Sequence, residues 1–151
     1  MDDQEIAEII FPDDNDLEQF LKNEGSYDMH EDLLKFGLET KKFLYVDYKG
    51  EQYQEMVNFM LDYEFAHHIE LASKEELEQL EAYKYEFLPD KIREANKILS
   101  PKGYGLFSYP NSGDFYVLFI GKLENITKLL QEELLLDDRI PFQERCIKYY
   151  S

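Results

Sequence analysis

Asp47 has the position most typical of a catalytic or ligand-binding carboxylate. It follows the apolar residues 43–46 and precedes a loop and a helix, where α/β enzymes often hold such a group. With Tyr48 and His68 it defines a candidate ligand site. The loop runs Lys-Gly-Glu, and an acid at the start of the next helix would repel a phosphate. The alternative is a solvated strand end at which Asp47 pairs with the lysine of that loop.

The one local cluster of potential metal ligands is His67, His68 and Glu70. Neighbouring residues in a strand point to opposite faces, so only His68 would share a face with Glu70. A tetrahedral site needs further ligands, and His30 is the only other histidine in the chain. The sequence therefore predicts no metal site and no cofactor.

Asp13, Asp14 and Asp16 suggest an EF-hand loop, but the pattern of that loop does not follow. A loop starting at Asp14 would place Gln19 where the turn needs glycine and Gly25 where it needs a bidentate glutamate. Helix capping is the better explanation for these acids.

Cys146 is the only cysteine, and no motif of nucleophilic catalysis surrounds it. The chain contains no G-x-S-x-G, Walker, G-x-G-x-x-G, Cys-x-x-Cys or H-E-x-x-H pattern. Nothing places Cys146 at a helix N-terminus or beside a base, so we interpret it as a small buried hydrophobe on a terminal strand. The sequence predicts no catalytic residue and no enzymatic activity.

Acidity is the strongest feature of the composition. The 151 residues carry a net charge of −17, and residues 1–32 contain 12 acids with a single base, Lys22. Such a chain is a poor ligand for nucleic acid phosphates or anionic lipid. The acidic surface instead predicts docking of a basic partner. The candidate partner-binding residues are Asp13, Asp14, Asp16, Glu18, Glu24, Asp28, Glu31 and Asp32.

The N-terminus and the single cysteine predict a cytoplasmic protein. The first residues are acidic where a secretory signal would be basic and then apolar, and no uncharged apolar run approaches the ~18 to 20 residues that span a bilayer. One cysteine cannot form an internal disulfide, which suits a reducing compartment.

Residues 1–38 form an acidic segment that the pattern predicts as two or three short helices. Asn15 with Glu18, and Asp28 with Glu31, have the spacing of a capping box, in which the first and fourth residues satisfy the free N–H groups of a helix start.

The segment 43–71 is predicted as a right-handed βαβ unit. Residues 43–48 are a strand by composition, and we expect it to be central because apolar side chains occupy both faces. Residues 53–61 have the apolar spacing of an amphipathic helix. Residues 68–71 would then be a second strand, reached over that helix.

The second half contains further helices and a hairpin. Ser73 with Glu76 opens a helix that Pro89 ends or kinks. Residues 104–120 predict a β-hairpin around a Pro-Asn-Ser-Gly-Asp turn. The remaining predicted elements are a long helix over 126–134 and a strand over 146–150. Residues 1–151 are thus expected to form one α+β domain, with a mixed or antiparallel sheet of four to five strands packed by helices.

In size, acidity and lack of catalytic motifs, the chain is similar to the small cytosolic immunity proteins that bacteria keep against toxins. Residues 43–51 and 113–120 also resemble segments of an uncharacterised bacterial domain family of similar length, over about 17 of the 151 residues. The resemblance implies non-enzymatic binding partners and adds no functional residue.

The leading hypothesis is a binding protein of the immunity or inhibitor type. Its acidic face would steer a basic toxin domain or nucleic-acid-binding protein and occlude a phosphate-binding cleft. One alternative is a domain whose charge only keeps it soluble. Another is a small enzyme or ligand-binding domain with a pocket near Asp47. The oligomeric state is left open.

Overall fold

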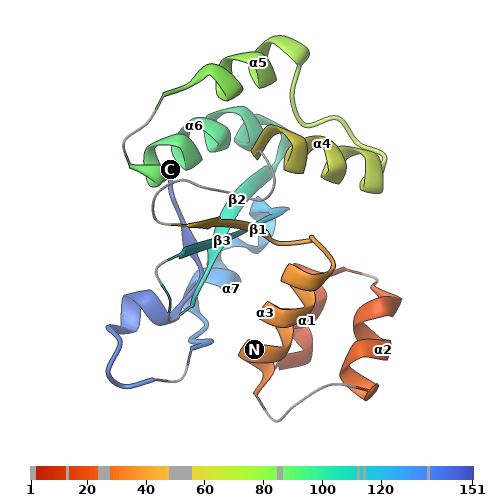
Figure 1. Ribbon diagram of the computed structural model, residues 1–151, viewed down its shortest axis with the longest axis vertical. Coiled ribbons are helices and arrows are strands. Elements are labelled where there is room, and N and C mark those ends of the chain that lie inside the picture. Colours follow the sequence, from red (N-terminus) through yellow and green to blue (C-terminus); the bar gives the residue numbers. More distant parts are fainter. Residues whose placement is uncertain are drawn as a thin grey trace.

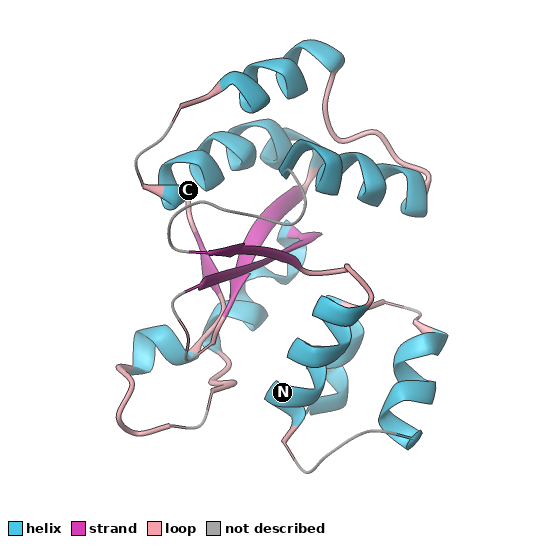
Figure 2. Cartoon of the chain, in the orientation of Figure 1, coloured by secondary structure: helices cyan, strands magenta, loops and turns pink. Residues whose placement is uncertain are grey.

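A four-stranded antiparallel sheet lies between two layers of helices in the described part of the computed structural model (Figures 1 and 2). The structure describes residues 3–12, 14–23, 28–47, 56–84, 87–111, 113, 115–135 and 137–151. The helices are α1 (Asp3–Ile10), α2 (Asn15–Asn23), α3 (Met29–Glu39), α4 (Met56–His67), α5 (Lys74–Ala82), α6 (Leu88–Leu99) and α7 (Ile126–Gln131). The strands are β1 (Leu44–Asp47), β2 (Tyr104–Tyr109), β3 (Phe115–Lys122) and β4 (Lys148–Tyr149), in the order β1-β3-β2-β4. The predicted α+β class, helical N-terminus and hairpin are confirmed.

Alternate side chains of the strands enter two separate cores, one on each face of the sheet. The aliphatic core, toward α4, α5 and α6, receives Leu44, Val46, Leu106, Leu118 and Ile120 from the sheet. The aromatic core, toward α1, α2, α3 and α7, receives Phe107, Tyr109, Val117, Phe119 and Ile147, together with Phe43 just before β1. Full burial of each such side chain contributes about 1.5 to 3 kcal/mol, so both layers of helices stabilise the sheet.

Two crossover connections put helices on both faces. β1 and β2 are each antiparallel to β3, so they run parallel to each other, and α4, α5 and α6 connect them over the aliphatic core. β3 and β4 are each antiparallel to β2, and α7 lies between them on the side of the aromatic core. Parallel strands require such long connections.

The predicted βαβ unit over residues 43–71 is wrong, because residues 68–71 form no strand. His68 follows α4 with a positive φ of 56° and turns the chain away. The Glu64 carboxylate then accepts hydrogen bonds from the backbone N–H groups of Leu71 at 2.6 Å and Ala72 at 3.2 Å, so these donors do not enter a ladder. The crossover that begins at β1 ends at β2 instead.

β1 is an edge strand, not a central one. It pairs with β3 alone in the described sheet. Its composition resembles that of a central strand because helices cover both of its faces: Leu44 and Val46 lie in the aliphatic core and Phe43 in the aromatic core. Apolar composition therefore reports burial of the two faces, not the number of neighbouring strands.

The helix caps are largely as predicted. Asp28 caps α3, and Ser73 opens α5 with a complete capping box. At α2 the cap is Asp14 instead of Asn15, because the Asp14 Oδ1 accepts a hydrogen bond from the backbone N–H of Leu17 at 3.1 Å. The predicted arrangement is thus displaced by one residue.

Element boundaries in the second half of the chain also differ from the prediction. Pro89 does not end α5, which stops at Ala82, but lies in the first turn of α6, where a missing N–H leaves no hydrogen bond unmade. The last helix, α7, ends at Gln131, before residue 134. The predicted terminal strand shortens to β4, Lys148–Tyr149.

Asn96 joins α6 to the sheet through a buried side-chain amide. Its Nδ2 donates to the carbonyl oxygens of Leu106 at 3.3 Å and Tyr150 at 2.7 Å. Its Oδ1 accepts from the backbone N–H of Leu106 at 2.7 Å. In the β2–β4 register Tyr150 would face Leu106, so the Asn96 amide replaces the ladder bonds that β4 is too short to make.

Replacing Asn96 with alanine is expected to lower the free energy of unfolding by about 2 to 4 kcal/mol, because it leaves buried backbone groups without partners. Asn58→Ala, at an exposed position of α4, is the matched control and should change stability by no more than about 0.5 kcal/mol. Urea unfolding followed by circular dichroism measures both. Equal losses in the two variants would contradict the role given to the Asn96 amide.

Candidate functional site

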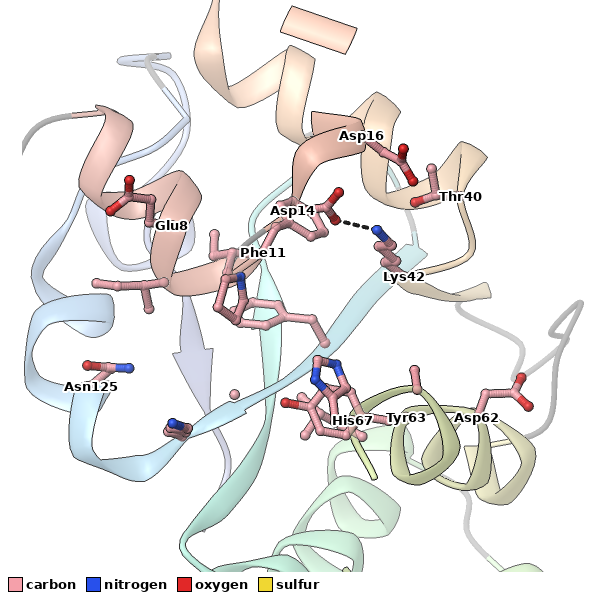
Figure 3. Close-up of a pocket in the computed structure, with 18 of the residues that line it drawn as sticks. Glu8, Phe11, Asp14, Asp16, Thr40, Lys42, Asp62, Tyr63, His67 and Asn125 are labelled. Atoms are coloured by element: carbon pink, nitrogen blue, oxygen red, sulfur yellow. Dashed lines mark hydrogen bonds and ion pairs between the residues drawn. The ribbon is translucent and has the colours of Figure 1, made fainter. Parts of the chain in front are cut away.

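A cleft of about 930 Å³ opens between the two layers of helices at one end of the sheet (Figure 3). Its walls come from α1 and the start of α2 on one side and from α4 on the other, with α7 contributing at its edge. Phe119 of the aromatic core and Ile120 of the aliphatic core both line it. The cleft therefore lies where the two layers part at the end of β3.

The turn between α3 and β1 places Lys41 and Lys42 in the lining. Thr40 ends α3, and Lys41 follows with a positive φ of 60°. Phe43 then folds back on Gly37: its N–H donates to the Gly37 carbonyl at 2.9 Å, and its ring fills the space where a Cβ would come within 2.3 Å. Because Gly37 has no side chain, Phe43 packs closely against it, and this packing determines where Lys41 and Lys42 lie.

Tyr63 and His67 lie one turn apart on α4 and point into the cleft, with ring centroids 4.0 Å apart (Figure 3). Burial raises the pKa of Tyr63 to about 12, and Tyr104 adds to the effect. Burial also lowers the pKa of His67, and the positive charges of Lys42 and His68 lower it further. Both rings are therefore neutral at pH 7.

An ion pair between Asp14 and Lys42 links the N-terminal segment to the start of β1 (Figure 3). The side chain of Asp14 is only 9% exposed, whereas that of Lys42 is 41% exposed. The Lys42 ammonium also lies 5.2 Å from the centroid of the Phe36 ring. Asp14 uses Oδ1 to cap α2 and Oδ2 to bind the lysine, so one carboxylate holds both the helix start and the cation.

The lining of the cleft is acidic on balance. Six carboxylates and four lysines line it, and His67 adds no charge at pH 7. Four of the carboxylates come from the acidic N-terminal segment. The lining acids are Glu5, Glu8, Asp14, Asp16, Asp62 and Glu124, and the lining bases are Lys41, Lys42, Lys122 and Lys128.

The eight acids predicted to bind a partner have different surroundings in the structure. Asp14 and Asp16 line the cleft. Asp28 caps α3, and Asp32 is buried, with 6% exposed, so neither presents a free carboxylate to a partner. The others are Glu18 and Glu31, which are exposed away from the cleft lining, and Asp13 and Glu24, which lie outside the described residues.

The predicted ligand site at Asp47, Tyr48 and His68 stays a prediction, because the structure describes only part of it. Asp47 pairs with Phe115, at the opposite end of β3 from the cleft, and its side chain and all of Tyr48 lie outside the described part. His68 is exposed directly after α4, whose last turn borders the cleft through His67. About 20 Å of strand separates Phe115 from Gly121 in the cleft, at ~3.3 Å per residue.

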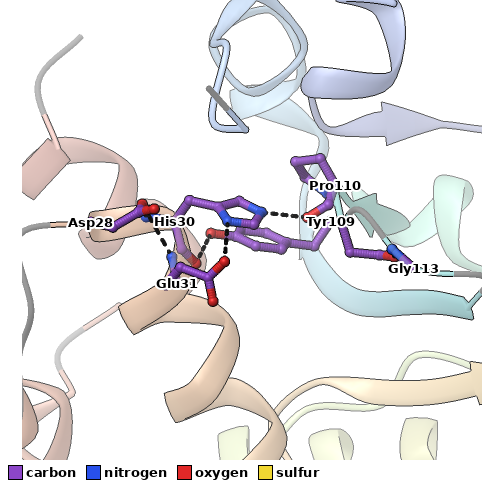
Figure 4. A network of polar contacts seen from close by, with 7 residues as sticks. Asp28, His30, Glu31, Tyr109, Pro110 and Gly113 are labelled. Carbon is purple, nitrogen blue, oxygen red and sulfur yellow. Dashed lines mark hydrogen bonds and ion pairs between the residues drawn. The ribbon is translucent and has the colours of Figure 1, made fainter. Parts of the chain in front are cut away.

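His30 is buried and ties α3 to the end of the hairpin (Figure 4). Its Nε2 lies 2.7 Å from the Pro110 carbonyl oxygen, and the Tyr109 hydroxyl donates to the His30 carbonyl at 3.1 Å. Its Nδ1 has no hydrogen-bond partner and lies 3.9 Å from a carboxylate oxygen of Glu31. With Nε2 engaged by backbone, this histidine connects two parts of the fold.

Cys146 is buried, as predicted, beside a smaller hollow of about 480 Å³ near the hairpin turn. Burial raises the pKa of its thiol, and Glu133 adds to the effect. The Sγ donates to the Phe142 carbonyl at 3.6 Å. The neutral thiol is therefore favoured, which is the opposite of an activated nucleophile.

The described ranges contain neither a cluster of metal-ligating side chains nor a helix that could span a membrane. No group of three or more His, Cys, Asp or Glu side chains there could hold a metal ion. None of the helices described is long and apolar enough to cross a membrane.

These features define a three-layer α+β domain with an acidic cleft between its helix layers. The chain belongs to the DUF6630 family, a domain of unknown function, whose family model matches residues 3–139. The matched range includes every residue that lines the cleft and ends before β4. The chain matches no curated protein and no solved structure.

Sequence reasoning missed Tyr63, His67 and Lys42 as parts of a site. The predicted helix ends at residue 61, whereas α4 continues to His67, and this extra length carries both rings. The spacing of Tyr63 and His67 by four residues is the signal that could have placed them on one helix face. No comparable signal in the sequence brings Lys42 to Asp14.

Lys42→Met is expected to raise the pKa of His67 toward its ordinary value of 6.5, because a neighbouring positive charge is removed. In the unmodified protein the pKa of His67 is lowered by folding, so the folded protein binds the imidazole proton less readily than the unfolded chain does. The His67 contribution to stability is thus present above pH 6.5 and is lost as the pH falls through the folded-state pKa. NMR titration of the imidazole measures the shift. Lys97→Met on α6 is the control, and an unchanged His67 pKa in Lys42→Met would contradict the assignment.

Cys146 is expected to react slowly with iodoacetamide in the folded protein, at least about tenfold more slowly than in urea, because burial both shields the thiol and disfavours the thiolate. Mass spectrometry of timed samples measures the rate. Similar rates in the folded and unfolded protein would show that the thiol is accessible.

Proposed function

We propose that the domain is a non-enzymatic binding protein that docks a basic partner in the cleft between its helix layers. The partner is a basic protein such as a toxin domain or a nucleic-acid-binding protein, and the domain acts as its immunity or inhibitor protein. We place it in the cytosol, where the single free thiol of Cys146 stays reduced. The observation that carries the proposal is the gathering of N-terminal carboxylates on one wall of a large cleft.

Charge supports a basic partner over an acidic one. The net charge of −17 attracts cations at long range and raises the rate of encounter. Glu8 and Asp16 are exposed in the cleft wall, so an arriving basic segment meets them first. The neutral rings of Tyr63 and His67 on the opposite wall do not repel a cation.

The same complementarity of charge explains how docking would inhibit the partner. A protein that binds nucleic acid does so with a basic surface that contacts phosphates. A partner whose basic segment is held in the cleft cannot present that segment to nucleic acid. Glu18 and Glu31, exposed beyond the cleft, extend the negative field over which the partner approaches.

The size of the cleft favours one alternative, a small-molecule ligand. Its volume of about 930 Å³ falls in the range of about 300 to 1,000 Å³ usual for ligand pockets. A metabolite that binds there would raise the melting temperature of the protein by mass action. A thermal-shift screen with a metabolite panel separates this alternative from protein docking.

Replacing Glu8 with glutamine and Asp16 with asparagine is expected to weaken binding of an oligo-arginine peptide about tenfold at low salt, because two carboxylates of the docking wall lose their charge. The matched control is Glu78→Gln with Glu81→Gln, which removes the same charge from exposed positions of α5 in the other layer. Fluorescence anisotropy at low and high salt measures both pairs.

The salt dependence decides between docking in the cleft and unspecific attraction. Docking predicts that the Glu8 and Asp16 variant binds more weakly and with a smaller salt dependence, while the α5 control stays close to the unmodified protein. Equal weakening in the two variants would show that only the total charge matters, and the proposal would be wrong.

A further inference from the structure

We propose that Asp14 is the anchor for an arginine side chain of the partner, and that Lys42 occupies this cation position in the free protein. The inference rests on the proposed function and names the chemistry by which the cleft would recognise its partner. It follows from the ion pair, the rings around it and the freedom of the lysine side chain.

Asp14 has the properties of an anchor. Its side chain lines the cleft, yet it is only 9% exposed and pairs with the Lys42 ammonium. A carboxylate with so little access to water requires a cation or several hydrogen-bond donors. Oδ1 receives the backbone N–H of Leu17, and Oδ2 receives Lys42. The position beside Oδ2 is therefore a cation site that the chain fills by itself.

One aromatic ring contacts this cation site, and two more lie across the cleft. The Phe36 ring centroid lies 5.2 Å from the Lys42 ammonium. Tyr63 and His67 lie across the cleft, near enough for the charge of Lys42 to lower the pKa of His67 (Figure 3). Ring faces attract cations, and a guanidinium, which is planar and weakly hydrated, stacks on them better than an ammonium. The surroundings of Oδ2 thus suit arginine better than the lysine that occupies them.

The Lys42 ammonium can be displaced from Asp14 without disturbing the fold. Its side chain is 41% exposed, so the ammonium can turn into water on its flexible stem. Asp14 keeps its cap on α2, because that bond uses the other oxygen. The exchange replaces one ion pair with another, and Lys42 acts as a tethered competitor that lowers the apparent affinity for the partner.

Lys42→Met tests the competition, with Lys41→Met as the matched control. Both variants lose one positive charge from adjacent residues of the cleft lining, but only Lys42 binds Asp14. The probe is an oligo-arginine peptide, measured by fluorescence anisotropy at mildly alkaline pH, where His67 is neutral in every variant. Lys42→Met should bind the peptide about fivefold more tightly than the unmodified protein, and Lys41→Met should change its affinity by less than about twofold.

Asp14→Asn completes the cycle, because asparagine retains the capping oxygen and loses the charge. In the Asp14→Asn background, adding Lys42→Met should give no gain in affinity. A gain that persists there, or equal gains in Lys42→Met and Lys41→Met, would overturn the anchor while the proposed function stands. If no folded variant bound the peptide, as judged by unchanged circular dichroism and melting, the proposed function and the anchor would both be wrong.

Discussion

Because β2 and β3 carry apolar side chains on both faces, the sheet is stable only with helices packed on both sides. The two crossovers meet this requirement: α4, α5 and α6 cover the aliphatic core, while α7 joins α1, α2 and α3 over the aromatic core. Even at the edge strand β1, Leu44 and Val46 are buried in the aliphatic core, and Phe43, just before the strand, is buried in the aromatic core. The three layers are thus a consequence of side chains that cannot face water.

The cleft follows from the same constraint. Helices that pack on opposite faces of a sheet are held apart by its thickness, and at the end of β3 the cleft opens between them. The lining comes from α1, the start of α2 and the turn between α3 and β1 on one side and from α4 on the other. Residues from both layers can therefore act on one ligand only at such an end. At this end of the sheet the side chains of Asp14 and Lys42, 28 positions apart in the sequence, pair with each other.

The features that the sequence predicts are those with local causes. Turn residues determine the hairpin, and the spacing of Ser73 and Glu76 determines the capping box of α5. The pairing of β1 with β3 joins residues some 70 positions apart, and no local pattern encodes it. The failed strand at 68–71 has a similar cause, since the Glu64 carboxylate competes for its backbone donors only in the folded chain. The cleft is lined by segments that are separate in the sequence. The acidic N-terminal segment could be recognised in the sequence, but the residues of α4 that lie across the cleft from it could not.

The division into an aliphatic and an aromatic core also determines how the strands are aligned. In a sheet with one wet face, a slip of one residue would expose apolar side chains, so polarity fixes the register. Here a slip of β1 by one residue would move Leu44 and Val46 from the aliphatic core to the aromatic core, so hydrophobicity alone does not fix their register. The size and shape of the side chains oppose the slip. Phe43 would lose its ring contacts with Tyr109 and Phe119, at centroid distances of 5.0 and 5.7 Å. The register of this sheet is therefore specified by the size and shape of its side chains, and substitutions that keep hydrophobicity but change volume act on strand alignment as well as on packing.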